Sequence, residues 1–389
     1  MRKLITRFKL VTIYGLGQSL NSFGLLIVSL VVIKFKSIEF WGTYVELHIW
    51  INLLLLFASF GNKDQLLKRF SLSPSSIYQD WLTNFTSRLV LLIPCFVFLI
   101  VIPPLNPLIF YLIPWLVLSF IGQSFNSLIL FNRDFKISAQ IEVITNICYI
   151  ILVIILNRSL NINGLLKTIL IINLIRNVLY LFYYSNHLKS LNIRFRYNEL
   201  MEGLPFFIPL ALGTARTKMD TYFATTLFQS EELGKYQILV NFLSIGQLLI
   251  TYFFNPFIKS FYRLKQIALK RLKFQSLIFG FGFGLLYLLV IHIGVSKIFL
   301  LQFSQYNYII CMAFLFPLGL QMLIVNQIYK IDKQYIIISV SIFVIILQIT
   351  IGYSLMKNNG ISGALWVKSA SLWIITVLLW IWSRKFIKK

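Results

Sequence analysis

Residues 203–236 constrain this chain most, because the stretch is long enough to cross a lipid bilayer yet carries charges near its middle. The charged residues are Arg216, Lys218 and Asp220. A charged side chain at bilayer depth is costly, and such side chains almost always face the interior of a helix bundle or a water-filled cavity. The sequence therefore predicts that this segment lines a polar space inside a membrane.

Placing the segment on a helix, at about 100° per residue, separates its side chains into two arcs. The apolar arc consists of Ile208, Leu212, Ala215, Met219, Tyr222 and Phe223. The polar arc consists of Gly213, Thr214, Arg216, Thr217, Lys218, Asp220, Thr221 and Thr225. One arc suits lipid or packed helices, and the other suits water or a polar ligand. As an alternative, Arg216 and Asp220, one turn apart, would form an ion pair within the helix without making a site.

The amino-acid composition is that of a polytopic membrane protein. The chain is 58% hydrophobic and 12% charged, whereas a soluble domain has about 25% charged residues and lacks repeated apolar runs of about 20 residues. The formal net charge of +24 would also suit nucleic acid. However, the basic residues lie between apolar segments, where membrane topology accounts for most of them. We therefore expect no nucleic-acid partner.

Neither the cysteines nor the histidines form a pattern that is typical of a metal site or a catalytic centre. Cys95, Cys148 and Cys311 lie in apolar segments without CxxC spacing, which is typical of core residues. The apolar run after residues 1–9 continues for a full span without a cleavage pattern, so we expect no cleavable signal peptide. We expect no catalytic residue, no metal and no cofactor.

Twelve apolar segments have the length of a transmembrane helix. Their ranges are 10–33, 40–61, 82–102, 107–131, 139–157, 164–186, 203–228, 236–258, 275–296, 305–326, 334–355 and 361–382. Lys and Arg concentrate in alternate connections between these spans, which predicts that both termini face the cytoplasm. The expected fold is therefore an all-α, multi-pass membrane protein.

Five basic residues lie within the spans, where topology does not explain them: Arg88, Arg176, Arg216, Lys218 and Lys368. Arg88 is close enough to a helix end to reach the membrane surface, which is the alternative to a cavity role. Arg176, Arg216 and Lys218 lie deeper, which favours side chains that face a cavity. For Lys368 the sequence leaves open whether the side chain faces a cavity or reaches the membrane surface.

Three acidic residues lie within the spans, and they are candidates for coupling transport to protons or sodium ions. They are Asp220, Glu46 and Glu142, with His48 as a further titratable group. Glu46, His48 and Glu142 each lie near a helix end, so contact with the lipid headgroups is the alternative.

Matching features recur in the same order in both halves of the chain. Gly42 and Tyr44 enter the second span as Gly234 and Tyr236 enter the eighth, and the Asn-Gly pairs at 163–164 and 359–360 open the sixth and twelfth spans. This repetition predicts two six-helix bundles, 1–200 (with a cytoplasmic linker from about 187) and 201–389. An even number of spans in each half relates them by a pseudo-two-fold axis along the membrane normal, with a central cleft between them.

The first span carries a polar stripe at helical spacing, formed by Tyr14, Gln18, Asn21, Ser22 and Ser29. Because this span is the repeat partner of the charged seventh span, we expect Gln18 and Asn21 to line the central cleft. Packing between helices through small and hydrogen-bonding residues is the alternative.

Together these stretches resemble the multidrug/oligosaccharidyl-lipid/polysaccharide exporter superfamily, and within it the polysaccharide flippases of the O-antigen type. The similar stretches are 14–22 (YGLGQSLNS), 40–44 (FWGTY), 204–236, 255–257 (NPF) and 360–364 (GISGA). The resemblance covers essentially the whole chain. It implies a V-shaped pair of bundles that moves an undecaprenyl-diphosphate-linked oligosaccharide across a bacterial inner membrane by alternating access.

The resemblance also implies roles and partners. Arg216 and Lys218 best match the basic cavity residues that meet the diphosphate or acidic sugars, and Arg176 is next. The full set of candidate cavity residues is Arg216, Lys218, Asp220, Arg176, Arg88, Lys368, Gln18 and Asn21. The implied partners are the lipid-linked oligosaccharide, membrane lipids, a polysaccharide polymerase and a chain-length regulator of lipopolysaccharide synthesis.

Rival functions remain open at this point. A multidrug or cation antiporter of the same superfamily would be expected to place carboxylates in its cavity, whereas this chain offers mainly positive charges. A polysaccharide polymerase or glycosyltransferase needs catalytic groups at the membrane surface, often on a large loop, and the outer connections here are short. We therefore do not expect an enzyme. A structural or assembly protein would not need the charges of residues 216–220.

Overall fold

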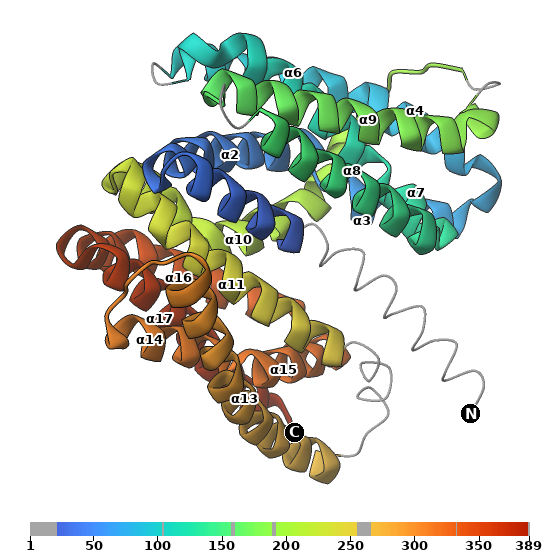
Figure 1. Ribbon diagram of the computed structural model, residues 1–389. Coiled ribbons are helices and arrows are strands. Elements are labelled where there is room, and N and C mark those ends of the chain that lie inside the picture. The colour runs from blue at the N-terminus through green and yellow to red at the C-terminus, as the bar shows by residue number, and fades with distance from the viewer. Residues whose placement is uncertain are drawn as a thin grey trace. The chain divides into compact units, whose positions relative to one another are not determined.

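The computed structural model describes residues 22–102, 105–156, 160–188, 192–254, 266–331 and 333–387. Within these ranges the chain is built from helices and their connections, and no strand occurs (Figure 1). The all-α class predicted from the apolar runs is confirmed. Gln18, Asn21 and the first half of the predicted first span, residues 10–21, lie outside the described residues, so the expected place of Gln18 and Asn21 in a cleft stays a prediction.

By its internal contacts the described chain divides into two compact units, an N-terminal unit that ends at Ala211 and a C-terminal unit that begins at Leu212. The division falls within one helix, α10 (Asn198–Leu227), and beyond the predicted boundary between 200 and 201. Whether the halves 1–200 and 201–389 are the functional domains stays a prediction.

The first described element of the N-terminal unit is the helix Ser22–Phe35. Its other elements are α2 (Ile38–Ser59), α3 (Asn62–Leu72), η1 (Pro74–Ser76), α4 (Ile77–Arg88), η2 (Leu89–Leu91), α5 (Leu92–Val101), η3 (Asn106–Leu108), α6 (Ile109–Ser124), α7 (Asn126–Asn132), α8 (Phe135–Ile155), α9 (Ile162–Leu188) and the start of α10. Helix α9 packs against α6 and α8, and α2 packs against α6. A core of large apolar side chains holds α3, α4, α7, α8 and α9 together, and it includes Phe70, Trp81, Phe125 and Tyr184.

A tight turn joins α2 to α3 and receives the start of α10. Phe60 and Gly61 have φ values of 45° and 70°, in the left-handed region. A Cβ on Gly61 would lie 2.7 Å from the backbone nitrogen of Phe207, so only glycine lets α10 approach this turn so closely. The rings of Phe60 and Phe207 stack with their centroids 4.5 Å apart.

Ion pairs and hydrogen bonds fasten the first turns of α10 to the same unit. Arg69 Nη1 donates to Glu199 Oε1 at 2.6 Å, and Gln65 Nε2 donates to the Glu199 carbonyl at 3.0 Å. Pro205 and Pro209 follow within the helix, where each lacks the N–H of a normal helical hydrogen bond. These contacts explain why the start of α10 belongs to the N-terminal unit although the apolar pattern assigns it to the second half.

The C-terminal unit contains the rest of α10, α11 (Ser230–Phe254), α13 (Gln266–Ile293), the π-helix η6 (Gly294–Ile298), α14 (Gln305–Leu315), α15 (Leu318–Lys330), α16 (Gln334–Leu347), the π-helix η7 (Gln348–Gly352) and α17 (Tyr353–Ile387). Helices α15, α16 and α17 share an apolar core that includes Ile324, Ile328, Val344 and Leu379. Gly360, with φ 53° and ψ −133°, interrupts α17, so the segments before and after it are separate helices.

Nine helices among the described residues are long and apolar enough to cross a membrane. One of these, Tyr335–Ser383, contains both of the last two predicted spans, which meet at Gly360. Helix α10 is outside this set, and its charges lower its hydropathy. The chain is a multi-pass membrane protein.

Helices α4 and α13 begin before the predicted residues 82 and 275, because polar residues that the hydropathy pattern assigned to connections are helical.

Candidate functional site

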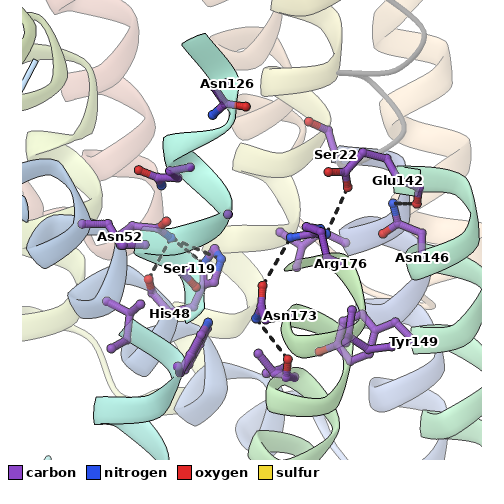
Figure 2. A pocket seen from close by; sticks show the side chains of 18 of the residues that line it. Ser22, His48, Asn52, Ser119, Asn126, Glu142, Asn146, Tyr149, Asn173 and Arg176 are labelled. Carbon is purple, nitrogen blue, oxygen red and sulfur yellow. Dashed lines mark hydrogen bonds and ion pairs between the residues drawn. The ribbon is translucent and has the colours of Figure 1, made fainter. Parts of the chain in front are cut away.

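A polar cavity of about 450 Å³ lies inside the N-terminal unit (Figure 2). Its lining comes from the helix Ser22–Phe35 and from α2, α6, α7, α8 and α9. The polar and aromatic lining residues are Ser22, Tyr44, His48, Asn52, Trp115, Ser119, Gln123, Asn126, Glu142, Asn146, Tyr149, Asn173, Arg176 and Tyr180. The volume falls within the roughly 300–1,000 Å³ that is typical of small-molecule sites.

An ion pair in the wall of this cavity joins α8 to α9. Arg176 Nη2 lies 3.0 Å from Glu142 Oε2, and Arg176 Nη1 donates to Asn173 Oδ1 at 3.3 Å. The remaining donor, Arg176 Nε, has no hydrogen-bond partner in the described part of the chain. Glu142 is buried. The alternative that its carboxylate contacts the lipid headgroups is therefore not what the structure shows. Arg176 faces a cavity, and its charge is matched there.

Asparagine side chains line the cavity and are oriented by their own helices. The Nδ2 atoms of Asn52, Asn146 and Asn173 donate to the backbone carbonyls of the residues one turn earlier, at distances of 2.8, 2.8 and 3.0 Å. In the view of Figure 2, Asn52, His48 and Ser119 lie on one side, Glu142, Asn146 and Tyr149 on the other, and Asn173 and Arg176 between them. Such amides both donate and accept hydrogen bonds.

Aromatic rings complete one wall of the cavity. The rings of Tyr44 and Trp115 stack with centroids 6.0 Å apart and an interplanar angle of 8°. The His48 ring lies 6.0 Å from Trp115. Tyr44 and Trp115 are 2% and 4% exposed, so their rings back this wall and present little surface to the open space.

A second candidate site lies in the C-terminal unit, where Asp220 of α10 is held by two other helices. Lys368 Nζ of α17 donates to Asp220 Oδ2 at 2.9 Å, and the Tyr236 hydroxyl of α11 donates to the same oxygen. Asp220 is 1% exposed and Lys368 is 8% exposed. The alternative that Arg216 pairs with Asp220 is wrong, because Asp220 points toward α11 and α17. Lys368, which the sequence left open, is thus a buried partner of Asp220.

The two basic residues near the middle of α10 lack such partners. Neither Arg216 nor Lys218 has a carboxylate within 4.0 Å among the described residues. Lys218 is exposed and Arg216 is half-buried, while Gln348 Nε2 donates to the Arg216 backbone carbonyl at 3.0 Å. The predicted polar arc is therefore divided: Asp220 and its neighbour Thr221 are buried within the unit, and Lys218 is not.

Arg88 lies apart from both sites. It is 2% exposed, its Nε donates to Asn84 Oδ1 at 2.8 Å, and its guanidinium lies 5.1 Å from the centroid of the Phe120 ring. The alternative that Arg88 reaches the membrane surface is wrong, because these contacts hold the side chain inside the N-terminal unit. Arg88 is not among the cavity-lining residues either.

All three buried carboxylates of the described chain are paired with a basic residue. Glu142 pairs with Arg176, Glu199 with Arg69, and Asp220 with Lys368. Glu46 is half-buried and forms no ion pair with any residue that the structure describes. The unmatched charges near the middle of α10 are therefore positive.

Sequence reasoning missed the amides, Trp115 and Glu199. Asn52, Asn126, Asn146 and Asn173 interrupt apolar runs in four different spans, which was a readable signal. Each of them alone is also typical of helix–helix packing, and only the fold brings them to one cavity.

Solved membrane transporters have this fold. A lipid II flippase, MurJ in an inward closed conformation, has a TM-score of 0.67 and 14% identity, over 97% of this chain and 87% of the flippase chain. An outward-facing multidrug resistance MATE family transporter of the MOP superfamily has a TM-score of 0.66 and 13% identity, over 99% and 96% of the two chains. A mutant of the Vibrio cholerae MATE transporter VcmN has a TM-score of 0.61 and 16% identity, over 100% and 98%.

The chain has the fold of MOP-superfamily transporters. No protein-family model and no curated protein matches its sequence. The similar structures named above are transporters and a flippase.

Proposed function

We propose that this protein is a flippase for a lipid-linked oligosaccharide, with an undecaprenyl-diphosphate carrier and an O-antigen or related repeat unit as its cargo. The polar head of such a lipid cannot cross hydrocarbon unaided, whereas its tail can remain in the bilayer. The protein moves the head from the cytoplasmic to the periplasmic leaflet by alternating access. The similarity to a lipid II flippase supports a lipid-linked cargo.

The observation that carries the proposal is the unmatched positive charge on α10. Arg216 and Lys218 have no carboxylate partner among the described residues, while the buried Asp220 is already neutralised by Lys368. A diphosphate accepts charge-assisted hydrogen bonds from guanidinium and ammonium groups, and Arg binds it with two parallel bonds. In the proposal, Arg216 and Lys218 of the C-terminal unit meet the diphosphate of the cargo.

Asp220 acts as a structural residue in this proposal, instead of a residue that binds a coupling ion. Its Oδ2 atom already accepts from Lys368 and Tyr236, so a proton or sodium ion would have to displace a buried ammonium group. Glu46 is the carboxylate left for ion coupling. No cofactor is needed.

The cellular setting follows from the same proposal. The protein lies in a bacterial inner membrane with both termini in the cytoplasm, as the distribution of Lys and Arg predicts. Its partners are membrane lipids, a polysaccharide polymerase and a chain-length regulator. The polymerase would take up the lipid-linked unit after it has been moved.

Multidrug or cation antiport is the second candidate function. The MATE transporters with the same fold favour it, as does Glu46, for which the described residues supply no ion pair. A cationic drug would bind best to free carboxylates, and the three buried ones are matched by basic residues.

Deletion of the gene in its host distinguishes the two functions. The flippase proposal predicts that surface polysaccharide is lost and that lipid-linked repeat units accumulate on the cytoplasmic side, with normal resistance to toxic cations. Intact surface polysaccharide together with increased sensitivity to cationic drugs would overturn the flippase proposal in favour of the antiporter.

A further inference from the structure

The cavity of the N-terminal unit has a chemistry that differs from the cationic stretch of α10. Five amide side chains line it, and they come from five helices: Asn52, Gln123, Asn126, Asn146 and Asn173. Asn52, Gln123 and Asn126 are exposed to the open space. An amide both donates and accepts hydrogen bonds, as does a sugar hydroxyl. This lining can therefore donate hydrogen bonds to the hydroxyl groups of a sugar ring and accept hydrogen bonds from them.

The cavity lining has no fixed net charge. Arg176 and Glu142 are its only Lys, Arg, Asp or Glu residues among those that the structure describes, and they lie 3.0 Å apart as an ion pair. Each of the two charges is therefore compensated inside the wall. An anionic ligand would find no unmatched cation here, and its carboxylate would lose water without gaining an opposite charge.

Aromatic side chains back one wall of the cavity. Trp115 and Tyr44 stack on each other, and His48 lies beside Trp115. Trp115 and Tyr44 are almost fully buried, so a sugar in this cavity would meet mainly the exposed amides and the half-buried His48. A cavity of about 450 Å³ admits a small saccharide and excludes a long chain.

We propose that this cavity is a binding subsite for uncharged sugar units with hydroxyl and acetamido substituents, and that it rejects acidic sugars. The inference rests on the proposed flippase function, since it assigns part of the cargo to a place in the fold. In this proposal the amides of the N-terminal unit recognise the identity of the sugar.

Binding of soluble disaccharides to the purified full-length protein in lipid nanodiscs tests this subsite. The neutral probes are chitobiose, lactose and maltose, and the acidic probe is digalacturonic acid, with dissociation constants measured by saturation-transfer NMR titration. We expect at least one neutral disaccharide to bind and digalacturonic acid to bind at least ten-fold more weakly. Equal or tighter binding of digalacturonic acid, or binding of none of the neutral probes, would overturn the proposal.

Variants of the lining asparagines test whether the disaccharide binds in this cavity. Asn52→Ala and Asn126→Ala should each weaken binding of the neutral disaccharide by about three- to ten-fold, the usual value of one lost hydrogen bond. Asn359→Ala is the matched control, because Asn359 is an exposed asparagine of the C-terminal unit. If the cavity variants bind the disaccharide as the control does, the subsite lies elsewhere and the proposal fails.

The ion pair provides a second, independent test. Glu142→Gln leaves the Arg176 charge unmatched, so digalacturonic acid should gain affinity by ten-fold or more. The double variant Glu142→Gln/Arg176→Met restores a neutral lining and should lose that gain, which also keeps the test valid if the single variant is poorly stable. No gain in Glu142→Gln would contradict the proposed role of the charge balance.

The proposed function and the subsite can fail separately. If the deletion strain keeps its surface polysaccharide, the flippase function is wrong whatever the disaccharides do. If the deletion blocks transfer of the lipid-linked unit but the disaccharide measurements fail, the flippase function stands and the subsite alone is wrong.

Discussion

Lys368 Nζ lies 2.9 Å from Asp220 Oδ2, and this buried ion pair joins the last helix to α10 inside the C-terminal unit. The Tyr236 hydroxyl donates to the same carboxylate, so three helices meet at Asp220. The pair determines which charges of α10 stay unmatched. With Asp220 neutralised by α17, Arg216 and Lys218 are left for a ligand.

Removal of Lys368 is predicted to destabilise the protein strongly. Lys368→Met leaves the Asp220 carboxylate buried without its cation, which typically costs about 3–5 kcal/mol. The double variant Asp220→Asn/Lys368→Met removes both charges and should recover most of this loss. Thermal unfolding of the purified proteins in detergent measures the difference, and equal melting temperatures for the single and double variants would contradict the account.

The ion pairs that hold the start of α10 on the N-terminal unit are predicted to contribute unequally to the free energy of unfolding, with Glu199 contributing much more than Glu202. Arg69 pairs with both, but the Glu199 side chain is 3% exposed and the Glu202 side chain is 60% exposed. Glu199→Gln disturbs a buried pair, with an expected loss of about 3 kcal/mol, whereas Glu202→Gln alters a surface pair worth about 0–1 kcal/mol. Urea unfolding of both variants provides the comparison, and a larger loss for Glu202→Gln would refute the assignment.

Gly61 is predicted to be required at the turn that receives α10. Gly61→Ala combines a φ of 70° with a Cβ that would lie 2.7 Å from the Phe207 nitrogen, so we expect a loss above the roughly 1–2 kcal/mol of the left-handed conformation alone. Gly282→Ala is the matched control. It lies in α13 with no atom within 4 Å of its Cβ, and should stabilise the protein by up to about 1 kcal/mol. The prediction is wrong if the two variants have similar melting temperatures.

The helices and their approximate positions could be predicted from the sequence because apolar runs of this length are uncommon outside transmembrane helices. Asn359 and Gly360 predicted the start of the last span, and Gly360 interrupts α17 there. The start of α13 could not be placed, since its first polar turns have no apolar signal. The unit to which the start of α10 belongs could not be predicted either, because its contacts with Phe60, Gln65 and Arg69 are long-range.

The candidate sites were predictable only in part. The unusual charges of α10 are visible in the sequence, but the partner of Asp220 is 148 residues away, and helical periodicity carries no information at that distance. A local pairing with Arg216 was the natural alternative, and it is wrong. Likewise, Glu142 and Arg176 lie on consecutive helices, where their ion pair depends on how α8 packs against α9.

Transfer of a lipid-linked saccharide in reconstituted vesicles tests the central claim most directly. Vesicles contain polyprenyl-diphosphate-linked chitobiose, and an impermeant glycosidase reports the fraction that reaches the outer leaflet. Wild-type protein should make the inner pool accessible, Arg216→Ala/Lys218→Ala should reduce the rate at least ten-fold, and Arg216→Lys/Lys218→Arg should retain most of it. Lys235→Ala, which alters an exposed pair with Glu231, is the control. Transfer by the double alanine variant at the wild-type rate would contradict the claim that these two charges bind the cargo.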